Sequence, residues 1–582
     1  MGADASARRP APGTVADLVP RAVRVITEVA AVDRPFDYTL NDALDYVGVG
    51  DRVRVDFHGR SVRAWVVQDV PPSDDLKGVK KWLGYGPPAS ELALLQWASN
   101  RWYSSWSRFL LAASPTRVVT SLPSAPPASR LSIDVSTGAG PGVVQLAPTT
   151  DPLPLVLSAY EVTREREGSL LVLVPTEGWA TRLRGRLEQR GCAVAQGDDQ
   201  WDRMRTGWPV VVGARGSAVA PVPRVAGAVI IDADDESYRS SASPTWDSVS
   251  MLRERCRRDN APLWCTSMFP SPTLLDRADC YRDSDDVGGW PRVTPVDRRS
   301  RDPHEGVLSE VALRASHAAL EGDEPVAVVV ILQRLGTGRL LACAKCGELA
   351  RCAQCQQAEE EVGDQLACAD RHELRARFCR HCGSTKLRGV RSGVTTLVRD
   401  VAAQLNQAVS EVTAASREAP TARVVVGTEA AWQHVRRCGV VIFADFDQYL
   451  LAPRESARRS AITAVGKAGR LVGSRREGRG SVILQTRRGD DVVIDALVNA
   501  SFDDLIREDV ETAELLGLPP YGALARVTGE GAENFVLGLS ESKVTIVSAP
   551  NGYVVRADDV DTLTSALRDA PRPSVKFRVA VD

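Results

Sequence analysis

Seven of the chain's 12 cysteines lie close together, at a spacing that suits metal coordination. Six form CxxC pairs and the seventh stands alone: Cys343, Cys346, Cys352, Cys355, Cys368, Cys379 and Cys382. A CxxC turn lets two thiolates approach one tetrahedral ion, and two such turns complete a zinc site. Repeated pairs in a large chain indicate metal rather than disulfide bonds. The sequence therefore predicts at least one Zn²⁺ site.

A second zinc site needs one more ligand, because seven thiolates fall one short of two tetrahedral sites. His372 follows Cys368 by four residues and is the expected eighth ligand, while His381 lies inside the last CxxC pair. Basic residues surround that pair, and the one acidic residue among them is Glu373; they are Arg371, Arg375, Arg377, Arg380, Lys386, Arg388 and Arg391. We expect Arg375 and Arg377 to contact DNA phosphates. The alternative is a solvated, charged surface.

The composition limits the class of protein. A chain of 582 residues exceeds a single core, and 44% hydrophobic with 25% charged residues is typical of soluble domains. The formal net charge of −2 creates no global positive field, so nucleic-acid affinity must come from local patches. No apolar run is long enough to cross a bilayer, and no signal peptide is evident. We expect a cytoplasmic, nucleoid-associated protein with no membrane partner.

Apolar patterns predict several domains of mixed α/β type. Residues 1–20 are rich in Ala, Pro and Arg and are expected to be disordered. Alternating residues followed by a helical pair predict a β-rich domain over 21–119. Residues 120–142 are rich in Ser, Pro and Gly and indicate a linker. Buried strands then alternate with helices both before and after the cysteines, which predicts two parallel α/β layers.

The order of several motifs resembles the bacterial primosomal replication-restart protein family (primosomal protein N prime, PriA), a family of superfamily 2 DNA helicases. The motifs are RPFDYTL, GDRVRV, DDLKGVKKWL, LLVLVP, VVGARGSAVAP, IIDADDESY, VVVGTEA, FADFD, AVGKAGR, GSVILQT and LGLPPYGALAR. The resemblance covers most of the chain, and the Arg-, Ala- and Val-rich, Lys-poor composition is similar to that of actinobacterial members. It implies an α/β fold with two degenerate RecA-like helicase lobes and an inserted zinc module. A β-rich N-terminal DNA-binding domain and a small α+β C-terminal domain complete the implied architecture.

The resemblance also implies domain limits. Domain 21–119 binds the 3′ end of DNA, and the linker 120–142 stands where the family carries a winged-helix domain. The remaining parts are lobe 1 (143–295), lobe 2 (296–339 and 390–505), the zinc-binding insertion (340–389) and the C-terminal domain (506–582).

Site residues can be carried over from the family. Its zinc array pairs the first and last CxxC turns on one ion, which here are Cys343, Cys346, Cys379 and Cys382. Cys352, Cys355 and Cys368 belong to the other ion. The eighth thiolate is expected at Arg371, so His372 is its candidate replacement. The family captures a 3′ DNA end through an Asp and a Lys, which match Asp37 and Lys77. The alternative is that both are ordinary surface residues.

The family's ATP-binding motifs are altered here. The chain has no GxxxxGK[ST] phosphate loop, and the family's loop falls on residues 149–153 with Pro152 at the lysine position. The family's DEEH motif begins Asp232-Ala233, so alanine replaces the glutamate that polarises water. Lys467 replaces one arginine-finger residue and Arg470 remains. The resemblance therefore implies no catalytic residue and a lost ATPase.

These features predict a replication-restart (primosome assembly) protein that binds Zn²⁺ and branched or forked DNA with a 3′ end. Expected partners are the replicative helicase or its loader and single-stranded DNA-binding protein. One alternative is a weak ATP-dependent 3′→5′ helicase that uses the Gly-rich stretch 137–144 as its phosphate loop. Another is a zinc-stabilised protein-interaction scaffold without a DNA role.

Overall fold

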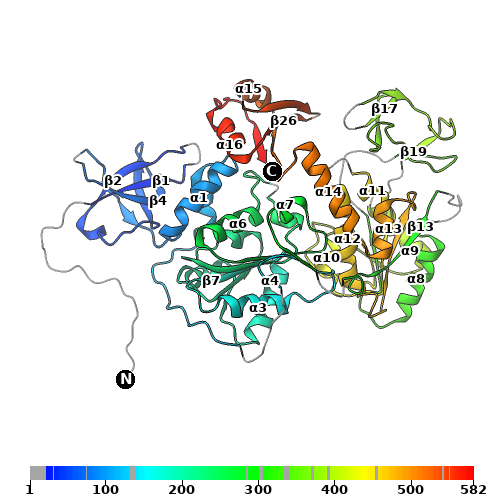
Figure 1. Cartoon of the computed structure of the whole chain (residues 1–582), viewed down its shortest axis with the longest axis horizontal. Helices are drawn as coiled ribbons and strands as arrows, with labels where there is room; N and C mark the ends of the chain where they lie inside the picture. Colours follow the sequence, from blue (N-terminus) through cyan, green and yellow to red (C-terminus); the bar gives the residue numbers. More distant parts are fainter. Residues whose placement is uncertain are drawn as a thin grey trace.

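A computed structural model describes residues 21–29, 32–73, 75–131, 139–240, 242–282, 286–299, 306–332, 341–368, 372–389, 394–452, 456–539, 543–549 and 551–582. The disorder predicted for residues 1–20, and the basic residues Arg371 and Arg391, lie outside these ranges. Two central α/β lobes carry a β-rich domain at one side, a C-terminal domain above and a separate small module at the far end (Figure 1). No helix in the described ranges is long and apolar enough to cross a membrane.

The N-terminal domain is an antiparallel sheet of five strands in the order β2-β1-β4-β3-β5. Its strands are β1 (Arg21–Thr27), β2 (Phe36–Leu40), β3 (Arg52–Phe57), β4 (Arg60–Val70) and β5 (Lys81–Trp82), with a 3₁₀ turn η1 (Asp42–Leu44). Alternate residues such as Val53 and Val55 are fully buried, which is why this pattern forms a strand with one core face. His58 and Gly59 both have positive φ at the tight β3–β4 hairpin, as a two-residue turn requires.

Helices α1 (Ala89–Arg101) and α2 (Trp106–Ala112) follow this sheet and confirm the predicted helical pair. Glu91 on α1 is buried and forms an ion pair of 2.6 Å with Arg255, which is also buried. Arg255 donates further hydrogen bonds to the carbonyls of Ala220 and Val222. Burial raises the pKa of Glu91 to about 7, against the opposing effect of Arg255. Arg255 therefore pairs with the buried Glu91 and also fixes the backbone of residues 220–222 in lobe 1.

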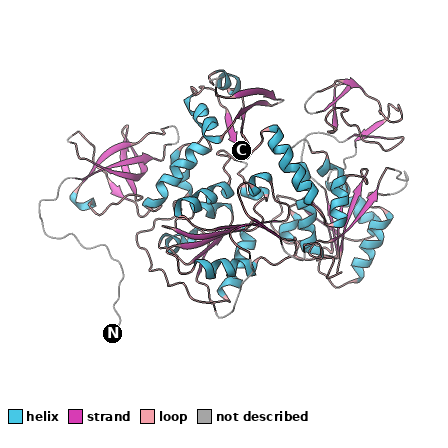
Figure 2. Ribbon diagram, in the orientation of Figure 1, coloured by secondary structure: helices cyan, strands magenta, loops and turns pink. Residues whose placement is uncertain are grey.

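The first lobe is a parallel sheet in the order β12-β6-β11-β10-β7-β9-β8, with helices on both faces (Figure 2). Its strands are β6 (Gly142–Gln145), β7 (Ser169–Leu173), β8 (Val194–Ala195), β9 (Val210–Gly213), β10 (Val225–Ile230), β11 (Leu263–Ser267) and β12 (Cys280–Arg282). Its helices are α3 (Leu153–Thr163), α4 (Glu177–Glu188), α5 (Trp201–Arg205), α6 (Ser248–Asp259) and α7 (Pro272–Leu275), with 3₁₀ turns η2 (Asp198–Gln200), η3 (Arg215–Val219) and η4 (Glu236–Tyr238). The central strands are fully buried and mostly apolar, because both faces of the sheet are covered.

The second lobe is a parallel sheet in the order β13-β23-β22-β14-β21-β20. Its strands are β13 (Arg292–Asp297), β14 (Val328–Ile331), β20 (Val409–Val412), β21 (Val424–Gly427), β22 (Val440–Phe443) and β23 (Ser481–Thr486). Its helices are α8 (Glu310–Glu321), α9 (Val394–Leu405), α10 (Ala431–His434), α11 (Asp447–Leu450), α12 (Ala457–Val472) and α13 (Val492–Asn499). The boundary predicted between residues 295 and 296 is too late, because β13 pairs along its whole length with β23.

The cysteine-rich module is inserted between β14 and α9 of the second lobe. Its two small sheets consist of β15 (Leu341–Cys343) with β19 (Leu387–Gly389), and of β16 (Glu359–Val362), β17 (Gln365–Cys368) and β18 (Arg375–Ala376). Few apolar side chains are buried here, so the module lacks a core large enough to be stable without further support.

The C-terminal domain is an antiparallel sheet in the order β25-β26-β24-β27. Its strands are β24 (Ala523–Thr528), β25 (Thr545–Ala549), β26 (Gly552–Ala557) and β27 (Arg578–Val581), and its helices are α15 (Ala532–Leu537) and α16 (Val560–Asp569). Helix α14 (Asp503–Leu516) leads into it, so the boundary predicted at 505 and 506 falls inside a continuous helix. Between α2 and β6, the residues that the structure describes contain no helix or strand.

Replacing Arg255 by Ala should destabilise the junction of α1 with lobe 1. The change leaves the Glu91 carboxylate buried without a cation, which costs about 3–5 kcal/mol. Urea unfolding of the full chain should show a lower midpoint. Arg257→Ala on the same helix is the control, because Arg257 is exposed and its partner Glu254 also pairs with Arg258. Equal midpoints for the two variants would contradict this account of the junction.

Candidate functional site

The first and last CxxC turns lie together in the inserted module. The Sγ atoms of Cys343 and Cys382 are 3.5 Å apart, and those of Cys346 and Cys379 are 3.6 Å apart. All four lie within 4.8 Å of one another. A tetrahedral zinc ion with bonds of about 2.3 Å requires sulfur separations of about this size. The structure therefore groups the four thiols as the resemblance implied, and this group can hold one metal ion.

Backbone N–H groups point at the sulfur atoms of these turns. Burial opposes ionisation, yet the N–H groups of Cys346 and Lys345 and the neighbouring thiols lower the pKa of Cys343 to about 6. Gly347 and Gly383, which follow the two turns, both have positive φ. Such residues allow the chain to fold back around a metal without a side-chain clash. In contrast, burial and the neighbouring thiols raise the pKa of Cys346 to about 12, so the backbone N–H groups favour a thiolate at Cys343 and not at every ligand.

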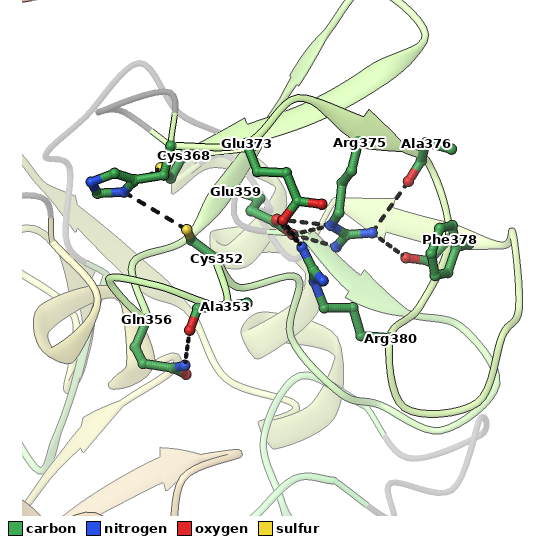
Figure 3. Close-up of polar contacts among 11 residues, drawn as sticks. Cys352, Ala353, Gln356, Glu359, Cys368, Glu373, Arg375, Ala376, Phe378 and Arg380 are labelled. Atoms are coloured by element: carbon green, nitrogen blue, oxygen red, sulfur yellow. Dashed lines mark hydrogen bonds and ion pairs between the residues drawn. The ribbon is translucent and has the colours of Figure 1, made fainter.

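The second group consists of Cys352, Cys355, Cys368 and His372. The Nδ1 atom of His372 lies 3.4 Å from the Sγ of Cys368 and 3.9 Å from the Sγ of Cys352. Figure 3 shows Cys352 and Cys368 on adjoining segments of the module. His381 belongs to neither group within the described ranges. The donor set of three thiolates and one imidazole suits zinc, although His372 is exposed whereas Cys352 and Cys368 are buried.

The Arg375 side chain is buried inside the module, where it cannot make the predicted contact with phosphate. Its side chain is 5% exposed, and its guanidinium makes an ion pair with Glu359 on β16, with Nε 2.8 Å from Oε1. It also donates to the carbonyls of Ala376 and Phe378, as Figure 3 shows. The expectation that Arg375 contacts DNA is therefore corrected, because its donors face the interior of the module.

The other cations near the last CxxC turn are partly neutralised. Arg377 is 41% exposed and pairs with Glu361 at 2.9 Å, while Arg380 pairs with Glu373 at 2.7 Å. Lys386 and Arg388 are exposed and make no ion pair among the residues that the structure describes. The missed signal is the run of glutamates on β16, which the sheet brings beside the arginines. The module is less basic than its arginines alone suggest.

Asp37 lies on β2 of the N-terminal sheet, directly across from Arg24 on β1. The Nε of Arg24 donates to one carboxylate oxygen at 2.8 Å and its Nη2 donates to the other at 3.0 Å. This contact lowers the pKa of Asp37, so the carboxylate is ionised at neutral pH. Arg24 was not among the predicted residues, although it is a charged residue that stands between the buried Val23 and Val25 of β1.

Lys77 lies along the same edge of the sheet. Its carbonyl accepts a hydrogen bond from the N–H of Thr39, two residues beyond Asp37. Its ammonium group is 3.8 Å from Asp56, and the Lys77 side chain is 66% exposed. Nearby, the rings of Phe36 and Phe57 pack edge to face at 4.9 Å. An ionised carboxylate, an exposed cation and aromatic surface therefore share this edge.

The segment expected to cradle phosphate forms a different contact. Asp151 accepts a hydrogen bond from the N–H of Leu153, the first residue of α3, at 3.1 Å. It also pairs with Arg186, and although burial opposes ionisation, this pairing lowers the pKa of Asp151. Pro152 has no N–H to offer. A carboxylate thus occupies the positive end of the helix, where a phosphate would otherwise bind.

Ion pairs join the two lobes across the cleft between them. Arg470 on α12 contacts Asp232, which follows β10, with Nη1 to Oδ2 at 2.6 Å and Nη2 to Oδ1 at 2.8 Å. Lys467, one turn earlier, lies 2.8 Å from Asp235. Both carboxylates are almost fully buried. Burial opposes ionisation of Asp235, but Lys467 lowers its pKa. Ala233, between the acidic residues, has no group that can activate water.

The ring of Trp179 extends the contact, since the Arg470 guanidinium lies over it at 4.9 Å. The Nε of Arg470 also donates to the carbonyl of Pro148 at 2.8 Å. A cavity of about 1250 Å³ remains beside these pairs, lined by residues of both lobes. The resemblance assigns Asp232 to magnesium and Arg470 to triphosphate, but in this structure the two side chains pair with each other.

Comparison with known proteins gives one match to a domain family and several matches to longer proteins. Residues 24–115 match the 3′DNA-binding domain (3′BD) of PriA. Relatives named replication restart protein PriA include those of Synechocystis, 23% identical over 61% of this chain and 48% of that protein, and Thermotoga maritima, 22% identical over 62% and 53%. The probable replication restart protein PriA of Mycobacterium leprae is 27% identical over 62% of this chain and 64% of its own.

The chain spans about half the length of the first of these relatives. A solved structure of S. cerevisiae Dbp5 bound to RNA and ADP BeF3 is 10% identical, covering 66% of this chain and 90% of that one, with a TM-score of 0.34. That score is too low to support any argument about function. Residues 24–115 therefore resemble a domain of PriA, and more than half of the chain is similar to proteins named replication restart protein PriA.

Proposed function

We propose that this protein is a replication-restart factor that binds branched DNA at a 3′ end without hydrolysing ATP. The observation that carries the proposal is the match of residues 24–115 to a 3′DNA-binding domain. The edge of that domain offers the ionised Asp37 as an acceptor for a terminal 3′-hydroxyl and the exposed Lys77 as a phosphate contact. Recruitment of the replicative helicase or its loader, and contact with single-stranded DNA-binding protein, follow from this role as proposals.

The cleft supports the second half of the proposal. A nucleotide would have to displace Asp151 from the start of α3 and separate Asp232 from Arg470. Pro152 and Ala233 supply neither a cation for the phosphates nor a base for water. Both costs act against binding before any chemistry begins. The factor would therefore work as a platform, and other enzymes would unwind the DNA.

Zinc is the proposed metal for both groups in the module. Thiolate-rich, tetrahedral donor sets favour Zn²⁺ over hard cations. Bound metal would provide the stability that the small core of the module cannot. The proposed chemistry is structural, since each group supplies four protein ligands and leaves no position open for substrate.

Asp37→Ala should remove the preference for a free 3′ end. Loss of one charge-assisted hydrogen bond weakens binding by about 10- to 100-fold. Fluorescence titration should show that the wild-type protein prefers a fork with a 3′-hydroxyl over one with a blocked 3′ end, whereas the variant binds both alike. Asp69→Ala is the control, because Asp69 also pairs with an arginine in the same sheet. If wild type does not distinguish the two forks, the assignment of Asp37 to the 3′ end is wrong and a protein scaffold becomes the better interpretation.

ATP should neither bind measurably nor be hydrolysed. Because Asp232 and Asp235 are paired to Arg470 and Lys467, these four groups are not available to magnesium or triphosphate. A phosphate-release assay with and without fork DNA should give equal background rates. DNA-stimulated release that disappears in Asp232→Ala would instead show a working motor and favour the weak helicase.

Metal analysis should find two zinc ions per chain. His372→Ala should reduce this to one, because it removes one ligand of the second group and leaves the first intact. His381→Ala is the matched control and should keep two ions, since His381 belongs to neither group. The assignment of His372 fails if both histidine variants keep two ions.

A further inference from the structure

Arg24, on the interior strand β1 of the N-terminal sheet, lies directly opposite Asp37 on β2. Its Nε and Nη2 atoms donate to the two different oxygens of that carboxylate, at 2.8 Å and 3.0 Å. Such a two-pronged contact fixes the rotation of a carboxylate as well as its position, which a single hydrogen bond does not. Within the described ranges Asp37 makes no other ion pair. The orientation of the Asp37 carboxylate therefore depends on Arg24.

The strands around this pair hold both side chains at the surface of the sheet. Tyr38, the next residue on β2, is buried, and its hydroxyl donates to the carbonyl of Asp56 at 2.8 Å. Because successive residues of a strand face opposite ways, the buried Tyr38 turns Asp37 outward. On the other side of β1, the pairing with β4 shifts register between Arg24 and Val25. Irregularities of this kind re-aim side chains beside functional sites. The position of the pair is therefore built into the sheet.

The pair is open to a ligand. The side chains of Arg24 and Asp37 are 38% and 30% exposed, so solvent still reaches both. A carboxylate has about four lone-pair positions, and the two contacts with Arg24 use one on each oxygen. The remaining positions can accept a hydrogen bond from a hydroxyl. An isolated carboxylate would repel the phosphates of a DNA strand, whereas a carboxylate paired with a guanidinium carries no net charge. The pairing therefore lets an acidic side chain act beside phosphates.

We propose that Arg24 is a positioning residue for the capture of a 3′ end by Asp37. In this role Arg24 orients the carboxylate for the terminal 3′-hydroxyl and cancels its charge against the last phosphate of the strand. The proposal rests on the proposed function, because it deepens the role of Asp37 in that site. The effect of Arg24 on the hydroxyl passes through Asp37. The two residues therefore act as one unit, and neither confers a preference for a free end alone.

The test is a double-mutant cycle in the full chain, with Arg24→Ala, Asp37→Ala and the double variant. Fluorescence titration measures binding to a fork with a free 3′-hydroxyl and to the same fork with a blocked 3′ end. Arg24→Ala should lower the ratio of the two affinities by about 10-fold, which corresponds to one charge-assisted hydrogen bond. Adding Asp37→Ala should not lower the ratio further. It should instead raise the affinity for blocked forks above that of Arg24→Ala, because it removes the unpaired negative charge.

Arg24→Lys separates charge from orientation. Lysine keeps the positive charge but cannot make the paired contact, so binding to blocked forks should stay close to wild type while the preference for a free end falls. The matched control is the pair of Arg21 with Asp69, because Arg21 also lies on β1 and its side chain is 36% exposed. Arg21→Ala and Asp69→Ala, alone and together, should leave the end preference unchanged. Thermal unfolding checks that each variant is folded, and Arg24→Lys carries the test if Arg24→Ala is not.

A lower ratio in Arg24→Ala that Asp37→Ala does not reduce further supports the positioning role. Equal losses from Asp37→Ala in the presence and absence of Arg24 overturn it, because the two residues would then act independently. An end preference that survives Arg24→Ala also overturns it, and in both of these cases the proposed function stands. A wild-type protein without any end preference would overturn the proposed function, and the positioning role with it.

Discussion

The pairing of Asp232 with Arg470 governs how the two lobes meet. A carboxylate as deeply buried as Asp232 requires a nearby positive charge, and here the other lobe supplies it. Removing either partner would leave the other charge buried and alone, which costs far more than the net worth of the intact pair. The ion pair therefore stabilises the contact between the lobes when no ligand is bound. Asp235 and Lys467 repeat the same arrangement one helical turn away.

The same rule operates on a smaller scale in the inserted module. Few apolar groups are buried there, so its shape depends on the two ligand groups and on the buried pair of Arg375 with Glu359. That pair joins β16 to β18 within one small sheet, and Arg375 also donates to the carbonyl of Phe378. Charge used inside a domain in this way is withdrawn from its surface. In this arginine-rich module, as in the whole chain with its net charge of −2, acidic side chains balance most of the positive charge.

Local patterns were enough to predict two α/β layers and at least one metal site, whereas the division of the cysteines into two ligand groups came from the family resemblance. Strands such as Val424–Gly427 are apolar throughout, which only a sheet covered on both faces explains, and CxxC spacing is itself the geometry of a metal turn. Contacts between distant residues were beyond such patterns. Arg375 meets a glutamate 16 residues away only because β16, β17 and β18 form one sheet. Arg470 and Asp232 are 238 residues apart, and the sequence gives no sign that they pair.

Helix α14 contacts both lobes before it enters the C-terminal domain. Asp503 near its start pairs with Arg282 of the first lobe, and Asp509 one and a half turns later pairs with Arg458 of the second. A rigid rod attached to two bodies removes their freedom to rotate independently. The C-terminal domain begins after the loop of residues 517–522 and also packs Phe535 against Tyr103, which follows α1. A single helix therefore ties the two lobes together before the third domain begins, so a probe placed on that helix would report the orientation of both lobes.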